Sequence, residues 1–198
     1  CSKAGIKPII GCETYLAPAS RHDKTNSYGI RNASFHIVLL ATNTLGYKNL
    51  IKLISAAHLE GFYYRPRLDK ELLRQYHEGL IGLSACLKGE VPFRLAEGNF
   101  PAAEKAAIEY CEIFGKGNFY IELQENKLDI QRKVNRDLLV LAKKMNLPIV
   151  ATADAHYLRR EDAKAHDVLM CIQTGKTVQD EQRMRFSTDE FYIKSPEE

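Results

Sequence analysis

The stretch that decides the fold reads FYIELQENKLDIQRKVNRDLLVLAKKMNLPIVATADAH and covers residues 119–156 of a 198-residue chain. Its two ends, 119–123 and 148–153, are short apolar runs that predict strands. Between them, residues 129–145 predict a helix that stops at Asn146. A strand, a helix and a second strand in this order indicate two parallel strands joined by a crossover helix.

The same alternation continues on both sides of this unit. Upstream, residues 80–85 predict a strand, and residues 90–95 and 102–114 predict helices, with Pro101 suited to a first helical turn. Downstream, residues 161–171 predict another helix. We therefore expect an α/β fold with a parallel sheet, either open or closed.

Nearer the start, residues 8–13 and 34–41 predict the two strands of a hairpin, joined by the polar stretch 19–32. Because hairpin strands run in opposite directions, the beginning of the second strand, at His36, should lie at the same face as Glu13.

A helix should follow the hairpin. Asn43 or Thr44 can cap its start, and Gly61 ends it. After a loop at 62–67, Asp69 can cap a short helix. The apolar face of the first helix is predicted to consist of Leu45, Leu50, Leu53, Ile54 and Ala57.

Polar residues stand where the predicted strands end, and in parallel α/β folds that edge is where sites are built. The sharpest pattern is Asp154-Ala-His156, because residues two apart in an extended segment project to one side. Each such residue has a structural alternative: a surface Asp, a packed His or a buried free Cys. The candidate metal ligands are Glu13, His36, Cys86, Asp154 and His156.

Taken together, carboxylate, imidazole and thiol groups on one face match Zn²⁺, Mn²⁺ or Fe²⁺, and a site for Mg²⁺ alone would not normally recruit Cys86. A metal there lowers the pKa of a bound water and neutralises charge on a phosphoryl group, so phosphoester hydrolysis is the expected chemistry. Asp154 and His156 are the predicted catalytic residues. His166, in the following helix, is interpreted as an ordinary helix residue.

Rival motifs are incomplete. Gly175-Lys-Thr177 lacks the first glycine of a phosphate-binding loop. Gly82-Leu-Ser-Ala-Cys86 imitates a nucleophile elbow but ends on cysteine, which leaves a serine hydrolase as an alternative without its full motif. In the loop 62–67, Arg65 and Arg67 alternate with aromatic residues and are candidates for nucleic-acid contact, although solvated arginines explain the pattern equally well.

Composition excludes several classes of protein. With 28 basic and 25 acidic residues there is no global basic field, so any DNA contact must be local. No apolar run is long enough for a membrane span and the start does not resemble a signal peptide, so we expect a cytoplasmic protein. Five cysteines without a CxxC pair favour reduced thiols.

Six segments, in this order, carry a family resemblance. Together they resemble the PHP (polymerase and histidinol phosphatase) domain of bacterial C-family replicative DNA polymerases, the DNA polymerase III alpha subunits. Residues 165–175 and 191–197 are similar to the segment that follows this domain in those polymerases. The six segments are KPIIGCE (7–13), FHIVLLA (35–41), GYKNL (46–50), GLSAC (82–86), FYIELQ (119–124) and ATADAHY (151–157).

The resemblance implies a distorted (β/α)7 TIM-like barrel with up to three divalent metal ions (Zn, Mn, Fe or Mg) at the strand ends. It places family ligands at the five candidate positions. It further implies residues 1–173 as a partial PHP domain and 174–198 as a connection toward the polymerase core. The implied activity is 3′ to 5′ proofreading exonuclease in the intact protein. The implied partners are DNA, the polymerase core, the sliding clamp and the clamp loader.

Two departures limit that activity. The family's first ligands, an HxH motif with further Asp and His residues, and its N-terminal strands would lie upstream of Cys1, so we expect a piece of a longer protein that binds metal incompletely by itself. The chain also contains no DxD pair, so nucleotide addition needs residues outside it. A non-catalytic scaffold and a solitary PHP phosphoesterase remain alternative functions.

Overall fold

The structure, a computed structural model, describes residues 1–26, 29–30, 33–195 and 197–198. Parts of the predicted connection 19–32 and residue 196 lie outside these residues.

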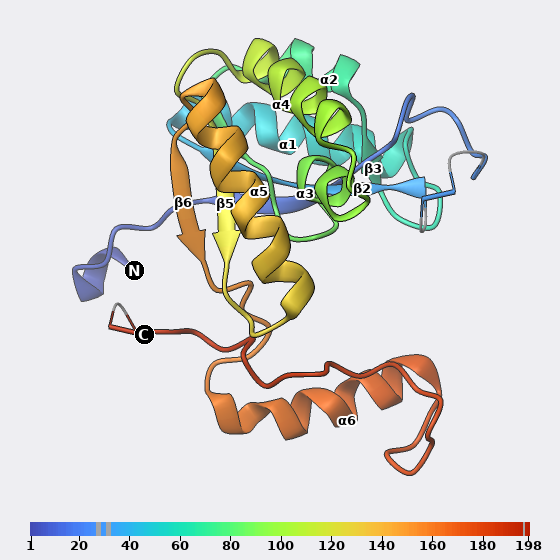
Figure 1. The fold of residues 1–198 in the computed structure, drawn as a ribbon. Coiled ribbons are helices and arrows are strands. Elements are labelled where there is room, and N and C mark those ends of the chain that lie inside the picture. Colours follow the sequence, from blue (N-terminus) through green and yellow to red (C-terminus); the bar gives the residue numbers. More distant parts are fainter. Residues whose placement is uncertain (27–28, 31–32, 196) are drawn as a thin grey trace.

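The chain has a mixed α/β fold (Figure 1). Its strands are β1 (Gly11–Leu16), β2 (Phe35–Ala41), β3 (Arg67–Leu68), β4 (Leu80–Leu83), β5 (Phe119–Gln124) and β6 (Ile149–Thr152). Its helices are η1 (Ser2–Ala4), α1 (Thr44–Leu59), α2 (Lys70–Tyr76), α3 (Glu90–Ala96), α4 (Phe100–Phe114), α5 (Asp129–Met145), η3 (Arg160–Asp162) and α6 (Ala163–Thr174).

The strands form one sheet in the order β3-β1-β2-β4-β5-β6. Pairing is parallel from β4 through β6, as the strand–helix–strand unit predicts, and β1 pairs antiparallel with β2, as the hairpin predicts. Since β2 is also antiparallel to β4, it runs against its neighbours while β1, β3, β4, β5 and β6 share one direction. Among the described strands, β3 and β6 remain edges, so the sheet is open here and a closed barrel is not seen.

Helix ends follow the capping residues. Asn43 begins α1, its side chain accepting a hydrogen bond from the Gly46 amide at 2.9 Å, and Asp69 does the same for α2 through Leu72. Asn146 ends α5 in the left-handed conformation. The predicted apolar face of α1 is wrong at Leu45, which is 43% exposed.

The core lies between the sheet and the helices. α1 packs against β2, β3 and β4, while α4 packs against β4 and β5. α5 buries one apolar face completely. Its residues are spaced four and three apart: Val134, Leu138 and Leu141. The start of α1 comes so close to the turn before β4 that a Cβ at Gly46 would lie 1.8 Å from the carbonyl oxygen of Gly79.

Two predictions about strands are corrected. Glu13 lies inside β1 and does not follow it, because the strand continues to Leu16 opposite Phe35. Arg67 belongs to β3, which pairs parallel with the end of β1, and not to a loop.

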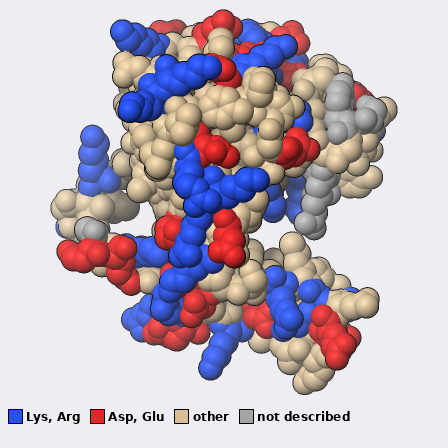
Figure 2. All heavy atoms as spheres, viewed as in Figure 1, with Lys and Arg blue, Asp and Glu red and all other residues tan. Residues whose placement is uncertain are grey.

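The segment from α6 onward lies beyond the carboxyl ends of β5 and β6, whose arrows point toward it (Figure 1). The chain after α6 then returns, and the Phe191 carbonyl accepts a hydrogen bond from the His156 amide at 2.7 Å. Basic and acidic side chains are interspersed on the face in Figure 2, with a run of basic ones across its middle. Within the described part of the chain, no helix combines the length and apolarity needed to cross a membrane.

Candidate metal centre

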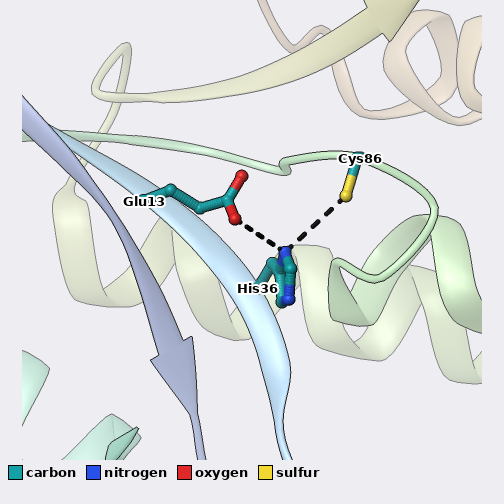
Figure 3. A group of neighbouring side chains, drawn as sticks. All are labelled: Glu13, His36 and Cys86. Carbon is teal, nitrogen blue, oxygen red and sulfur yellow. Dashed lines mark hydrogen bonds and ion pairs between the residues drawn. The ribbon is translucent and has the colours of Figure 1, made fainter. Parts of the chain in front are cut away.

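Three side chains, from β1, β2 and the loop after β4, meet at one point (Figure 3). His36 Nδ1 lies 2.9 Å from Glu13 Oε1 and 3.7 Å from Cys86 Sγ. One possible ligand atom from each residue lies within 4.8 Å of the other two. A carboxylate, an imidazole and a thiol therefore face one another at the spacing of groups that can share a metal ion.

The sheet register explains this meeting. Val38 of β2 pairs with Glu13 on one side and with Leu83 on the other. His36 is two residues before Val38, so its side chain projects to the same face of the strand. Cys86 follows β4 by three residues. The direction of β2 thus carries His36 to the end where β4 finishes, as the hairpin argument predicts.

Asp154 and His156 follow β6 and line the same cleft as these three residues. They lie outside the 4.8 Å cluster. His156 Nδ1 lies 2.7 Å from the Asp154 carbonyl oxygen, a hydrogen bond in which the ring donates and Nε2 is left as the free acceptor. Histidines that bind metals commonly donate their second ring nitrogen in this way.

The backbone is strained at two of the strand ends. Ala85, directly before Cys86, has φ 61°, and Asp154 has φ 48°. Residues other than glycine rarely adopt this left-handed conformation, and such strain concentrates at functional sites.

Burial and neighbouring groups shift the pKa values of the acidic side chains in the cleft in different directions. Hydrogen bonding to His36 lowers the pKa of Glu13, whereas burial raises the pKa of Asp154. Burial, followed by the charge of Asp154, raises the pKa of the Cys86 thiol to about 12. In the absence of a cation Cys86 is thus a thiol, and metal coordination has to displace its proton.

The donor set fits a divalent transition metal. A thiol beside an imidazole favours Zn²⁺ or Fe²⁺ over Mg²⁺, while carboxylates accept all of these ions. Among the described residues, the three clustered side chains could hold such an ion, and Asp154 and His156 line the same cleft.

Several cleft residues were missed by the sequence reasoning. His166, interpreted as an ordinary helix residue, stacks on Phe186 with the ring planes 4° apart and meets His156 edge to face. Phe191 packs against Phe186 and His156. No local sequence pattern predicts these contacts, because Phe186 and Phe191 belong to the segment after α6, which folds back onto the cleft.

Glu122 is a further unpredicted feature. It is buried in β5, where Oε1 accepts hydrogen bonds from Gln124 at 3.1 Å and Thr152 at 2.5 Å. Its Oε2 has no partner within the described residues, and burial raises its pKa.

The two candidate arginines have different surroundings. Arg65 is exposed and lines the cleft. Arg67 is 1% exposed, and its guanidinium donates to backbone carbonyls of Gly61, Ala33 and Asp23. The predicted nucleic-acid contact is wrong for Arg67, because a buried guanidinium with these partners cannot reach a phosphate.

The open mixed sheet and the Glu13–His36–Cys86 cluster agree with the comparison to known families. The model of the PHP domain matches residues 1–126, which is more than half of the chain. The chain belongs to the PHP domain family, whose members are generally metal-dependent.

Comparison with individual longer proteins shows which members of the family this chain is similar to. The chain is 48% identical over 197 residues to DNA polymerase III subunit alpha of Treponema pallidum. It is 48% identical over 194 residues to the subunit of the same name from Thermus aquaticus and 46% identical over 196 residues to that of Borreliella burgdorferi. These alignments cover 98–100% of this chain but 16–17% of each relative, so the chain spans about a sixth of the curated relatives it matches.

Proposed function

We propose that this chain is the PHP part of a bacterial replicative DNA polymerase and that its cleft is a metal-dependent phosphoesterase, a 3′ to 5′ proofreading exonuclease in the intact protein. The observation that carries the proposal is the convergence of Glu13, His36 and Cys86 in one cleft with Asp154 and His156. DNA, the polymerase core, the sliding clamp and the clamp loader are the partners that the longer relatives suggest.

The five residues have distinct proposed roles. Glu13, His36 and Cys86 hold a divalent ion, and Asp154 with His156 complete the ligands across the cleft. A bound ion supplies a Lewis acid for a phosphoryl group and lowers the pKa of water. The hydrogen bond from His156 to the Asp154 carbonyl keeps Nε2 directed away from the backbone, and the strained turn at Asp154 fixes where its carboxylate lies.

The architecture of the intact domain is also a proposal. We propose that the sheet is part of a distorted (β/α)7 barrel and that residues 1–173 belong to the PHP domain. Residues 174–198 connect it to the polymerase core. Support comes from five strands that share one direction, from the open edges at β3 and β6, and from relatives about six times longer than the chain.

The test uses the intact protein with Asp154→Asn and His156→Ala, and His58→Ala as the control. His58 is an exposed histidine near the end of α1 and does not line the cleft. We expect both cleft variants to lose bound metal and 3′ to 5′ hydrolysis while the control keeps both. Hydrolysis unchanged in both cleft variants would overturn the catalytic proposal. A metal-free protein that replicates normally would favour a scaffold.

A further inference from the structure

Two basic side chains stand beside the candidate metal centre. The cleft has a volume of about 370 Å³, and Lys88 and Arg65 line it together with the candidate ligands. Both also line an adjoining pocket of about 160 Å³. They therefore lie where the two hollows meet, on the path of any ligand that occupies both.

Neither cation has a direct ion-pair partner among the described residues. In the described part of the chain, the side chains of Lys88 and Arg65 form no ion pair and no hydrogen bond, although Arg65 lies over the ring of Tyr15 at 5.7 Å. Elsewhere in the described chain, Arg183 forms a two-pronged bridge with Asp167, and Arg21 binds Asp69. The cationic groups of Lys88 and Arg65, beside the candidate metal centre, are instead available to an anion from outside the chain.

The position of Lys88 narrows the kind of anion. Lys88 lines the same cleft as the carboxylates of Glu13 and Asp154 and forms an ion pair with neither among the described residues. Once a divalent ion neutralises the carboxylates, two uncompensated cations remain beside it. A phosphate ester, which carries negative charge on several oxygens, satisfies the metal and both side chains at once.

We propose that Lys88 and Arg65 together bind the phosphate group of the substrate that lies beside the metal centre, where the cleft meets the adjoining pocket. This inference rests on the proposed function and names the residues that recognise its substrate. The substrate class is a nucleotide at a DNA 3′ end. The rings of His166 and Phe186 line the same cleft, so aromatic groups lie beside the bound nucleotide.

The experiment compares Lys88→Met, Arg65→Met and Lys88→Arg in the intact protein, with Lys48→Met as the control. Lys48 is exposed on α1 and lines neither hollow. The p-nitrophenyl ester of thymidine 5′-monophosphate serves as substrate, because it is too small to depend on DNA contacts elsewhere in the polymerase. Metal content and binding of thymidine 5′-monophosphate to chelator-treated protein are measured in parallel.

For each methionine variant we expect KM to rise, and affinity for thymidine 5′-monophosphate to fall, by about tenfold, the value of one lost charge-assisted hydrogen bond. Metal content and kcat should be retained, and Lys88→Arg should bind like the unsubstituted protein. If KM and nucleotide affinity were unchanged in both methionine variants, this inference would be overturned. The proposed function would still stand as long as the unsubstituted protein hydrolyses the substrate.

An inactive unsubstituted protein with Lys88-dependent nucleotide binding would overturn the proposed hydrolysis and support the phosphate site. If inorganic phosphate binds as tightly as the nucleotide, the two cations are supported as phosphate ligands. That result would reject a DNA 3′ end as the substrate and would indicate small phosphate esters instead.

Discussion

Replacing Arg67 by methionine tests whether this side chain is structural. Methionine keeps an unbranched apolar stem but removes the guanidinium. In the folded chain that group donates to the carbonyl oxygens of Gly61 at 3.1 Å, Ala33 at 3.1 Å and Asp23 at 2.7 Å. It also lies over the ring of Tyr63, 5.0 Å from the centroid.

The magnitude follows from the surroundings of these acceptors. The bonds to Gly61 and Ala33 are buried, while the one to Asp23 is partly buried and water can replace it. Each buried carbonyl without a donor costs about 1–3 kcal/mol. Relief of the burial penalty on the guanidinium offsets part of this cost. We therefore expect Arg67→Met to lower the free energy of unfolding by about 3 kcal/mol.

Urea unfolding followed by circular dichroism measures this change, and Arg65→Met is the matched control. Arg65 is exposed and has no hydrogen bond from its side chain within the described residues, so its replacement should stay within about 0.5 kcal/mol. If Arg67→Met changed stability no more than the control, the assignment of Arg67 to the interior would be refuted.

Three further predictions concern the cleft and the core. Burial raises the pKa of Glu122, so the stability that its neutral carboxyl contributes is fully present below the unfolded pKa and is lost as pH rises through the folded pKa. Glu122→Gln should therefore gain stability relative to the unsubstituted chain as the pH of urea titrations rises above the ordinary carboxyl range, and a difference that stays constant with pH would contradict this. Because the pKa of Cys86 is about 12, Zn²⁺ affinity measured against a chelator should rise by up to about tenfold per pH unit through loss of the thiol proton, and an equal slope in Cys86→Ala would be inconsistent. Gly46→Ala should cost about 2 kcal/mol or more in urea unfolding, since its Cβ would lie 1.8 Å from the Gly79 oxygen, and a loss below about 0.5 kcal/mol would count against that contact.

Much of the secondary structure was predictable because its determinants are local. The bounds of α5 are those expected from its apolar spacing and from Asn146, and Asn43 and Asp69 cap the helices assigned to them. The order of apolar runs and helices is enough to indicate parallel pairing of β4, β5 and β6. Where the determinant was not local, prediction failed: β3 exists because two residues pair with the end of β1.

For the candidate site, too, the local features were predictable and the contacts between distant segments were not. Residue types and family motifs selected Glu13, His36, Cys86, Asp154 and His156, and the structure places all five along one cleft. Their roles as ligands stay predictions. The sequence ranked Asp154 and His156 first, whereas the tight cluster is formed by the other three. That reversal depends on the register of β2 between β1 and β4, which brings together residues 50 apart in the sequence.

By itself, then, the sequence determined the helices, the parallel half of the sheet, the hairpin and the chemical types at the strand ends. These depend on capping, periodicity and spacing within a few residues. Only the tertiary structure decided that Arg67 is buried while Arg65 is exposed, that Glu122 sits in the interior and that the chain after α6 returns to pack Phe186 and Phe191 on His156. Burial and convergence are set by contacts between segments distant along the chain, and such contacts leave no periodic signal in any one of them.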